Sequence, residues 1–261
     1  MQTNQEVIVV TGGASGIGEA CARRFAQAGH RVILADVNVE GGNGVTEALR
    51  RAGHDAQFHR LDLASEDSVS GFASHVIGEY GAPAVLVNSG GVLQNAVRVL
   101  DMDLAEFDRL FQINVRGTLL ASRAFGASMC EARRGSIINL CSMTTFRSSA
   151  QVAYTIGKVG LKALTETMAA EWGPRGVRVN AVAPGYTLTQ AMQARIDSGQ
   201  RDPNAVIERS ALRRFVEPSE VADAVYFLCS DQAAAITGVT LPIDCGWLAS
   251  TAYLAYASQP E

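Results

Sequence analysis

The chain has 261 residues, and its content of 48% hydrophobic and 18% charged residues fits a well-buried protein of one α/β domain or two small ones. The net charge of −4 gives no indication of nucleic acid or an anionic membrane as a partner. Five cysteines without a CxxC pair and four scattered histidines predict free thiols in a reducing compartment and no metal site. The N-terminus lacks signal-peptide features and no apolar run approaches the roughly 20 residues of a membrane span, so we expect a cytoplasmic protein.

Short apolar runs alternate with helical patterns along the whole chain. We expect strands near 6–10, 31–35, 56–61, 84–87, 136–141, 176–182 and 239–243. Between them, helices are expected up to 28, at 40–51, 66–78 and 103–130, up to 172, and at 218–229. This alternation predicts a doubly wound parallel sheet with helices on both faces, in a single domain that covers residues 1–261.

A glycine-rich stretch, TGGASGIG from Thr11 to Gly18, stands between the first predicted strand and the first helix. Glycines let the backbone approach a diphosphate closely, and the following helix N-terminus offers N–H groups to an anion. The spacing G-x-x-x-G-x-G differs from the commoner G-x-G-x-x-G, and a simple tight turn is the alternative. The order of strand, glycine loop and helix favours dinucleotide binding.

Further polar residues follow the ends of other predicted strands. A carboxylate at Asp36 can accept hydrogen bonds from the adenosine ribose hydroxyls and would repel a 2′-phosphate. Because no Lys or Arg lies in the glycine loop or directly after Asp36, NAD is favoured over NADP. Asp62 and Leu63 are placed to hold an adenine edge, and the turn from Asn88 to Gly91 suits close approach to a cofactor. Each could instead be an ordinary loop, cap or turn residue.

A candidate acid/base pair lies near the start of the long helix that ends at 172. Tyr154 and Lys158 are four residues apart and share a helix face, where an ammonium lowers the pKa of a phenol from its usual value of about 10. Lys158 and Lys162 are the only lysines among 22 basic residues. Ser142 follows a buried strand and can hydrogen-bond a substrate oxygen. The alternatives are a solvated lysine and a cap or turn serine.

Three other features are less specific. Asn114 lies in an apolar part of the helix at 103–130, so its amide must be satisfied by a structural network or must distort the helix and hold a water. Residues 186–215 are polar and predicted to be irregular and mobile, as a substrate lid or as a surface insertion. The aromatic tail from Trp247 to Tyr256 is expected to be buried, for instance against another subunit.

These residues together resemble the short-chain dehydrogenase/reductase family in its compact form of one Rossmann domain. The resemblance spans roughly residues 5–246 and rests on TGGASGIG, Asp36, Asp62-Leu63, NSGG, Asn114, Ser142, YTIGK and PGYTLT. Each piece is weak alone, but the combination is highly specific.

The resemblance implies roles for individual residues. Tyr154 would be the general acid/base, Lys158 would lower its pKa and hold the nicotinamide ribose, Ser142 would orient the substrate oxygen, and Asn114 would support a proton-relaying water. The residues implied around NAD are Gly12, Ser15, Gly16, Ile17, Gly18, Asp36, Asp62, Leu63, Asn88, Gly90, Tyr154, Lys158, Pro184, Gly185, Thr187 and Thr189.

Three positions depart from the family pattern. Asn88-Ser89-Gly90-Gly91 stands for the usual Asn-Asn-Ala-Gly, Asp244-Cys245-Gly246 stands for Asp-Gly-Gly, and Ile156 is larger than the small residues usual between Tyr and Lys. Gly90 is expected to loosen its turn. None of the three removes a catalytic group.

Within the family, residues 121–126 and 169–186 look most like bacterial polyol and sugar dehydrogenases. The resemblance implies an NAD-dependent dehydrogenase of a secondary hydroxyl in a small polar substrate, assembled as a homotetramer. Two alternatives stay open: a ketoreductase of acyl thioesters or other ketones, and a non-catalytic NAD-binding regulator. A metal-dependent alcohol dehydrogenase is disfavoured because the sequence has no ligand cluster.

Overall fold

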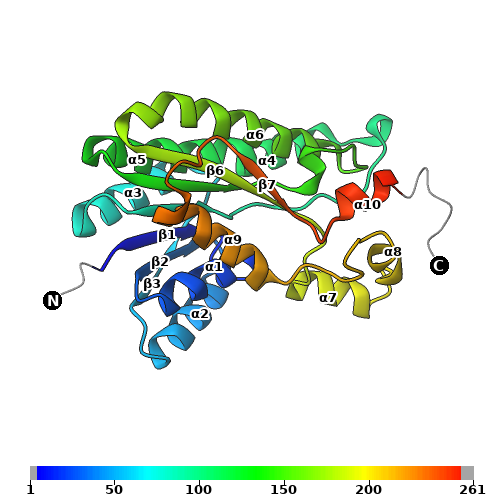
Figure 1. The fold of residues 1–261 in the computed structure, drawn as a ribbon, viewed down its shortest axis with the longest axis horizontal. Coiled ribbons are helices and arrows are strands. Elements are labelled where there is room, and N and C mark those ends of the chain that lie inside the picture. The colour runs from blue at the N-terminus through cyan, green and yellow to red at the C-terminus, as the bar shows by residue number, and fades with distance from the viewer. Residues whose placement is uncertain (1–4, 254–261) are drawn as a thin grey trace.

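The computed structural model describes residues 5–253, which form one seven-stranded sheet covered by helices (Figure 1). The strand order is β3-β2-β1-β4-β5-β6-β7, and every neighbouring pair is parallel. The strands are β1 (Val7–Thr11), β2 (Arg31–Asp36), β3 (Ala56–Arg60), β4 (Val85–Asn88), β5 (Gly135–Leu140), β6 (Val177–Pro184) and β7 (Thr240–Ile243). The doubly wound parallel sheet predicted from the sequence is confirmed.

Helices cover both faces of the sheet. Helices α1 (Gly16–Gln27), α2 (Val39–Arg51) and α9 (Pro218–Cys229) pack on one face, and α3 (Glu66–Tyr80), α5 (Gly117–Ala132) and α6 (Val152–Trp172) pack on the other. The remaining α-helices are α4 (Leu104–Phe111), α7 (Gln190–Asp197), α8 (Asn204–Ile207) and α10 (Trp247–Tyr253). Short 3₁₀ turns occur at η1 (Val99–Asp101), η3 (Met143–Thr145), η4 (Gly173–Arg175) and η5 (Asp231–Ala233).

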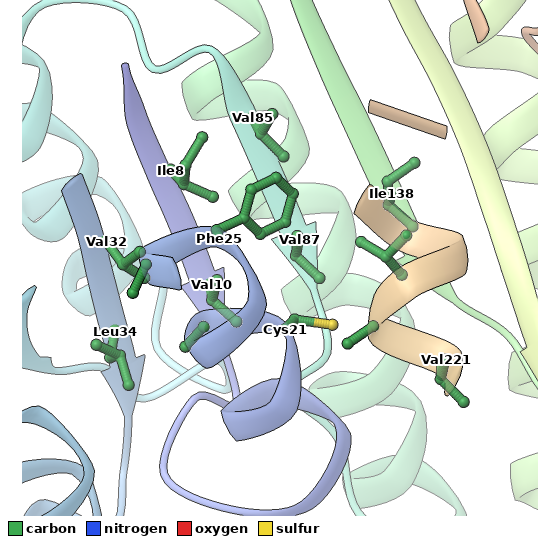
Figure 2. Packing of buried hydrophobic residues seen from close by; sticks show 14 of the residues in the cluster. Ile8, Val10, Cys21, Phe25, Val32, Leu34, Val85, Val87, Ile138 and Val221 are labelled. Carbon is green, nitrogen blue, oxygen red and sulfur yellow. The ribbon is translucent and has the colours of Figure 1, made fainter. Parts of the chain in front are cut away.

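The central strands are apolar on both sides because both sides are covered. In β1, Ile8 and Val10 face the α1 side, where Phe25 packs among them (Figure 2), while Val7 and Val9 face the opposite cluster. Successive strand residues point to opposite faces, so one short run of β-branched residues contributes to two separate cores. This explains why these strands read as continuous apolar runs in the sequence.

The topology places a crevice beside the end of β1. This strand pairs with β2 on one side and β4 on the other, so the chain leaves it in opposite directions across the sheet. In open parallel sheets, ligands bind outside the carboxyl ends of the strands at such a switch point. The loops after β1, β2, β4, β5 and β6 therefore meet at one edge.

The predicted strands and core helices agree with the structure to within two residues at each end. Three details differ. The helix expected at 103–130 is interrupted by a π-helical turn, η2 (Gln112–Arg116), which contains Asn114. The irregular conformation predicted for 186–215 is wrong where α7 and α8 form. The tail forms α10, in which Trp247 and Leu248 are half-buried whereas Ala252 and Tyr253 are exposed, and residues 254–256 lie outside the described part of the chain.

In the described part of the chain, no helix combines the length and the apolar character that crossing a membrane requires.

Candidate active site

A cavity of about 780 Å³ lies at the carboxyl ends of the strands. This volume is within the range of small-molecule and cofactor sites, about 300–1,000 Å³. The cavity brings together most of the residues that the sequence analysis selected. These are Gly12, Ser15, Gly16, Ile17, Asp36, Asp62, Leu63, Gly90, Ser142, Tyr154, Lys158, Pro184, Gly185, Thr187 and Thr189.

The glycine loop has the shape needed to admit a diphosphate. Gly12 has φ +69°, and a Cβ there would lie 2.6 Å from the Cα of Gly90, so two loops meet with only backbone between them. Ser15 is the N-cap of α1, but its side chain caps no N–H group. The backbone donors at the start of α1 are therefore left for an anion, as at other helix N-termini that bind phosphate.

Asp36 stands at the mouth of the cavity, at the end of β2. One of its carboxylate oxygens accepts from the N–H of Ala14 at 3.2 Å, and the other accepts from the N–H of Asn38 at 2.9 Å. These bonds fix the carboxylate between the glycine loop and the start of α2. The next cavity residue is Val37, which carries no charge, and in the described structure the one arginine of the lining is Arg109 of α4.

The structure explains why glycine stands at position 90, where the family pattern has alanine. A Cβ at Gly90 would lie 2.5 Å from Cδ1 of Leu63, so the leucine side chain fills the space that the family's alanine would use. The backbone N–H of Gly90 is also held by the Thr11 hydroxyl at 3.3 Å. At Gly90 the turn is therefore packed against Leu63 and hydrogen-bonded to Thr11.

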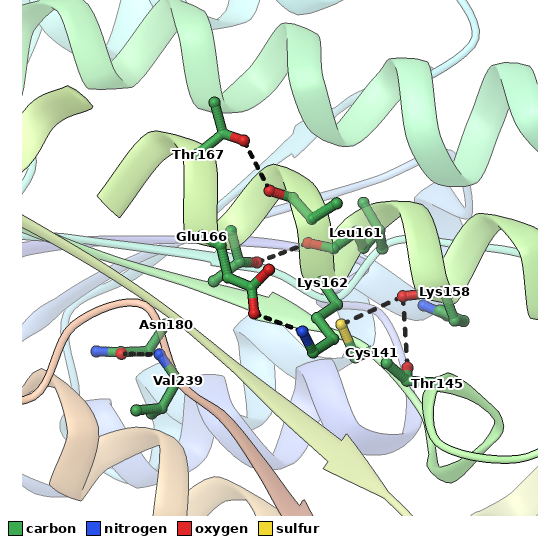
Figure 3. Close-up of polar contacts among 11 residues, drawn as sticks. Cys141, Thr145, Lys158, Leu161, Lys162, Glu166, Thr167, Asn180 and Val239 are labelled. Carbon is green, nitrogen blue, oxygen red and sulfur yellow. Dashed lines mark hydrogen bonds and ion pairs between the residues drawn. The ribbon is translucent and has the colours of Figure 1, made fainter. Parts of the chain in front are cut away.

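Lys158 is buried beneath Tyr154, between β5 and α6. Its ammonium nitrogen donates to the carbonyl oxygen of Leu140 at the end of β5 and lies 5.4 Å from the centroid of the Tyr154 ring. Its own carbonyl oxygen accepts from the Thr145 hydroxyl at 3.4 Å and from the Cys141 thiol at 3.6 Å (Figure 3). Backbone and side chain of this lysine are thus both tied to the segment that carries Ser142.

The two lysines of the chain have different environments. Lys158 is 7% exposed, whereas Lys162 is on the surface and pairs with Glu166 at 2.5 Å, one turn further along α6. A buried ammonium is costly unless it has partners, so Lys158 is held in place by the site rather than by solvation. The solvated-lysine interpretation fits Lys162 and not Lys158.

Ser142 is placed to donate a hydrogen bond into the cavity. Its hydroxyl oxygen accepts from the N–H of Thr144 at 3.2 Å, and its own N–H donates to the Thr145 hydroxyl at 3.4 Å. A hydroxyl has one proton and two acceptor sites. The backbone occupies one acceptor site, so the proton stays available for Tyr154 or for a substrate oxygen.

Burial dominates the ionisation of the two catalytic candidates. It raises the pKa of the Tyr154 phenol to about 12, against the opposing effect of the hydrogen bond from Ser142. Burial also lowers the pKa of the Lys158 ammonium. In the protein alone, the pKa of Tyr154 therefore moves opposite to the direction that the Tyr-x-x-x-Lys spacing predicts, because desolvation disfavours both charged forms.

Three of the predicted site residues do not line the cavity. Gly18 is buried in the first turn of α1, against the carbonyl of Gly12. The amide nitrogen of Asn88 donates to the Ser122 hydroxyl and to the Asn139 side chain, both at 2.9 Å, in a network behind the loop. Asn114 makes paired hydrogen bonds to the N–H and carbonyl of Val92, at 2.8 and 2.9 Å. Its amide is thus satisfied, and the helix around it is also distorted.

The segment 186–215 contributes part of the cavity wall. Residues Gln190, Ala191 and Met192 at the start of α7 line it, and Thr189 caps α7 and packs 3.4 Å from the position of a Cβ on Gly16. The base of the segment is closed by hydrogen bonds in which Leu188 donates to Val216 and Val216 donates to Tyr186. The lid candidate is therefore anchored at its base and borders the glycine loop.

Several residues at the site carry no sequence signal. Leu93, Arg109, Ile113 and Met192 line the cavity, and Gln94 is buried against the start of α6. Each lies outside the motifs, although Met192 belongs to the predicted lid 186–215 and Ile113 directly precedes Asn114. Between residues 5 and 253, no group of three or more His, Cys, Asp or Glu side chains is arranged to hold a metal ion.

Comparison with known proteins identifies the family. A family model described as enoyl-(acyl carrier protein) reductase, of the short-chain dehydrogenase/reductase type, matches residues 12–248. The chain belongs to the short-chain dehydrogenase/reductase family, and it is an oxidoreductase. Dehydrogenases of this family use a nicotinamide cofactor, NAD(H) or NADP(H).

Similar proteins act on alcohols of several kinds. The chain is 37% identical to a cis-4-hydroxycyclohexanecarboxylate dehydrogenase of Sinomonas cyclohexanicum, over 94% of this chain and 97% of that one. It is 39% identical to a D-threitol dehydrogenase of Mycolicibacterium smegmatis, over 93% and 92%. A crystal structure titled ribose-5-phosphate isomerase from Brucella melitensis 16M superposes with a TM-score of 0.92 at 41% identity, covering 99% of this chain and 98% of that one.

The raised pKa of Tyr154 gives a testable prediction. In the protein without cofactor we expect the phenol to titrate near pH 12, because burial favours its neutral form. The neutral phenol contributes to the stability of the fold at pH values below the ordinary tyrosine pKa of about 10. This contribution is lost as the pH rises through the pKa of Tyr154 in the folded protein. Adding NAD⁺ brings a positive charge to the cavity and is expected to lower the pKa.

The measurement is the tyrosinate absorbance during alkaline titration, taken as the difference between the wild type and Tyr154→Phe. A phenol that titrates near pH 10 and does not respond to NAD⁺ would contradict the burial described here.

Proposed function

We propose that this oxidoreductase is an NAD-dependent dehydrogenase that oxidises a secondary hydroxyl group of a small polar substrate, such as a polyol or a sugar. The observation that carries the proposal is the meeting of a serine hydroxyl, a phenol and a buried ammonium at the end of a cofactor-sized cavity. This combination can bind a hydroxyl group and remove its proton.

The three side chains have separable tasks. Ser142 donates its free proton to the substrate oxygen and orients it. Tyr154, as the phenolate, accepts the proton of the substrate hydroxyl. Lys158 holds positive charge 5.4 Å from the ring and stabilises the phenolate. Bound NAD⁺ would supply the hydride acceptor for the carbinol carbon and the positive charge of its nicotinamide ring.

The protein keeps Tyr154 mainly neutral until the cavity is filled. With a phenol pKa of about 12, little phenolate forms near neutral pH in the protein alone. A cation in the same low-dielectric cavity favours the phenolate, and Ser142 already acts in that direction. Proton removal is thereby coupled to cofactor binding.

Asp36 supports a preference for NAD over NADP. Its carboxylate is fixed at the mouth of the cavity by two backbone N–H groups and is followed by an uncharged valine. A 2′-phosphate at that position would face a negative charge, whereas a ribose diol can donate hydrogen bonds to the carboxylate.

The substrate class is inferred from the relatives and from the lid. The proteins that this chain resembles include a dehydrogenase of a four-carbon polyol and one of a cyclic hydroxy acid. We assign the segment 186–215 as the substrate lid of the single domain, because α7 lines the cavity while the base of the segment is pinned.

A second candidate function has one specific observation behind it. The matching family model is described as an enoyl-(acyl carrier protein) reductase, which favours a substrate carried as an acyl thioester. Such an enzyme would use the same three side chains, with Tyr154 donating a proton instead of accepting one. The alcohol dehydrogenases among the relatives make this the weaker of the two.

We infer a cytoplasmic homotetramer. All five cysteine side chains are unpaired thiols, which suits a reducing compartment. Apolar side chains stand exposed on two faces: Leu104 and Phe111 on α4 beside Ile156 on α6, and Leu241 on the sheet-edge strand β7. Two separate faces of this kind allow an assembly with two kinds of interface.

The test of the proposed function compares the wild type with Tyr154→Phe. We expect NADH formation with at least one polyol, sugar or cyclic alcohol, and a loss of kcat of about 10²–10⁴-fold in the mutant, because proton transfer to the phenolate is removed. Binding of NADH should change little. Tyr80→Phe, which removes a phenol on α3 far from the cavity, is the matched control.

Turnover of acyl thioesters with NADPH, and of no alcohol, would assign the second candidate instead. Unchanged turnover in Tyr154→Phe would contradict the role of the phenol in either reaction.

The cofactor preference gives a separate prediction. We expect Asp36→Ala to weaken NAD binding by about tenfold or more, which corresponds to loss of charge-assisted hydrogen bonds of about 1.5–3 kcal/mol. NADP binding should be affected less, because repulsion of its phosphate is also relieved. Dissociation constants for both cofactors, measured by fluorescence, check this, with Asp67→Ala on the exposed first turn of α3 as the control. Equal losses for both cofactors would place Asp36 away from the ribose.

A further inference from the structure

Gln94 is buried beside the catalytic helix, although no motif contains it. The residue lies between β4 and η1, and 1% of its surface is exposed. Its amide oxygen accepts a hydrogen bond from the backbone N–H of Tyr154 at 3.2 Å. Its amide nitrogen donates to the sulfur of Met102 at 3.0 Å. A backbone N–H requires an acceptor, so this contact fixes which way the amide is turned.

Helix α6 needs this acceptor because its own cap residue supplies none. Gln151 is the N-cap, and its side chain makes no capping hydrogen bond. The first N–H groups of any helix lack partners within the helix. Gln94 supplies one from sixty positions away in the chain, to the residue that carries the phenol. Without it, the N–H of Tyr154 would be buried without a partner.

Two further hydrogen bonds hold the same segment against the start of α6. The side chain of Gln151 donates to the carbonyl oxygen of Gln94 at 2.5 Å, and the N–H of Val97 donates to the carbonyl oxygen of Ala150 at 2.8 Å. The Gln94 segment and the residues before Tyr154 therefore form one hydrogen-bonded unit.

The other end of the segment is fixed to the distorted helix. Val92 is bonded through both its N–H and its carbonyl to Asn114 in the π-helical turn, and Val92 and Leu93 line the cavity. Residues 92–97 thus connect Asn114 with the start of α6, and the first two of them line the cavity.

We propose that Gln94 is a positioning residue that caps the catalytic helix and sets the place of the Tyr154 phenol. The proposal rests on the function proposed above, in which that phenol exchanges the substrate proton. Gln94 contacts no reacting group, so its loss should act on the chemical step and not on binding. A shift of about 1 Å in a reacting group can lower a rate by about a hundredfold.

The test uses two substitutions of similar size. Gln94→Met removes the acceptor, and we expect kcat to fall by about tenfold or more while KM and the affinity for NADH change less than about twofold. The acidic limb of the pH–rate profile for alcohol oxidation, which reports deprotonation of Tyr154, should also shift. Gln94→Glu keeps an acceptor oxygen in either protonation state and should restore kcat to within about threefold of the wild type. Gln57→Met, at a glutamine bonded to Tyr80, is the matched control.

A rise in KM with unchanged kcat would overturn the proposal, because it would place Gln94 in substrate binding. An unchanged kcat and pH profile in Gln94→Met would reduce Gln94 to a structural core residue and would also overturn it.

Amide hydrogen exchange gives a readout that does not depend on activity. The Tyr154 N–H should be protected in the wild type and in Gln94→Glu, and should exchange faster in Gln94→Met but not in Gln57→Met. If exchange follows this pattern while the wild type turns over no substrate, the capping contact stands and the proposed function fails. Equal protection of Tyr154 in all variants would overturn the capping contact itself.

Discussion

The parallel register of the central strands is the constraint on which the site depends. Thr11 pairs with Asn88, Asn88 with Asn139, and Leu140 with Val182, so β1, β4, β5 and β6 end along one edge. The loops that leave this edge carry the glycine turn, the Gly90 turn, Ser142 and the Pro184-Gly185 turn. Buried amides tie the row together below the cavity, from Asn88 through Asn139 to the Thr165 hydroxyl at 2.9 Å. The sheet therefore fixes the floor of the site before any ligand is present.

Burial and charge then determine the protonation states of Tyr154 and Lys158. Lys158 keeps its ammonium in a buried place by donating to the Leu140 carbonyl, and the phenol above it stays neutral because burial raises its pKa. In the protein alone, the phenolate of Tyr154 and the ammonium of Lys158 are each unfavourable, because the cavity is desolvated. In the proposed function, the positively charged nicotinamide ring would favour the phenolate. Asp36 lies at the end of β2, where it is proposed to accept from the ribose.

The sequence predicted the strands, the core helices and most of the cavity residues, because these leave local signals: β-branched runs covered on two faces, glycines where the chain must approach closely, and polar residues at strand ends. It did not predict α7 and α8, which have eight and four residues and are too short to show an apolar period. It did not predict that the side-chain amide of Asn88 donates to Ser122 and Asn139, because these partners are distant in the chain. Gln94 was missed because its partner is sixty residues away, and the direction of the Tyr154 pKa shift was missed because spacing does not report burial.

In the proposed reaction, a hydride passes from a carbinol carbon of the substrate to the nicotinamide. This transfer is measured with the wild-type protein, NAD⁺ and a polyol that carries deuterium on its secondary carbinol carbon. We expect the deuterium to appear in the reduced cofactor, with one label for each ketone formed. Loss of the label to solvent without reduced cofactor would contradict the proposal, because proton abstraction from carbon, as in an isomerase, would then be the reaction.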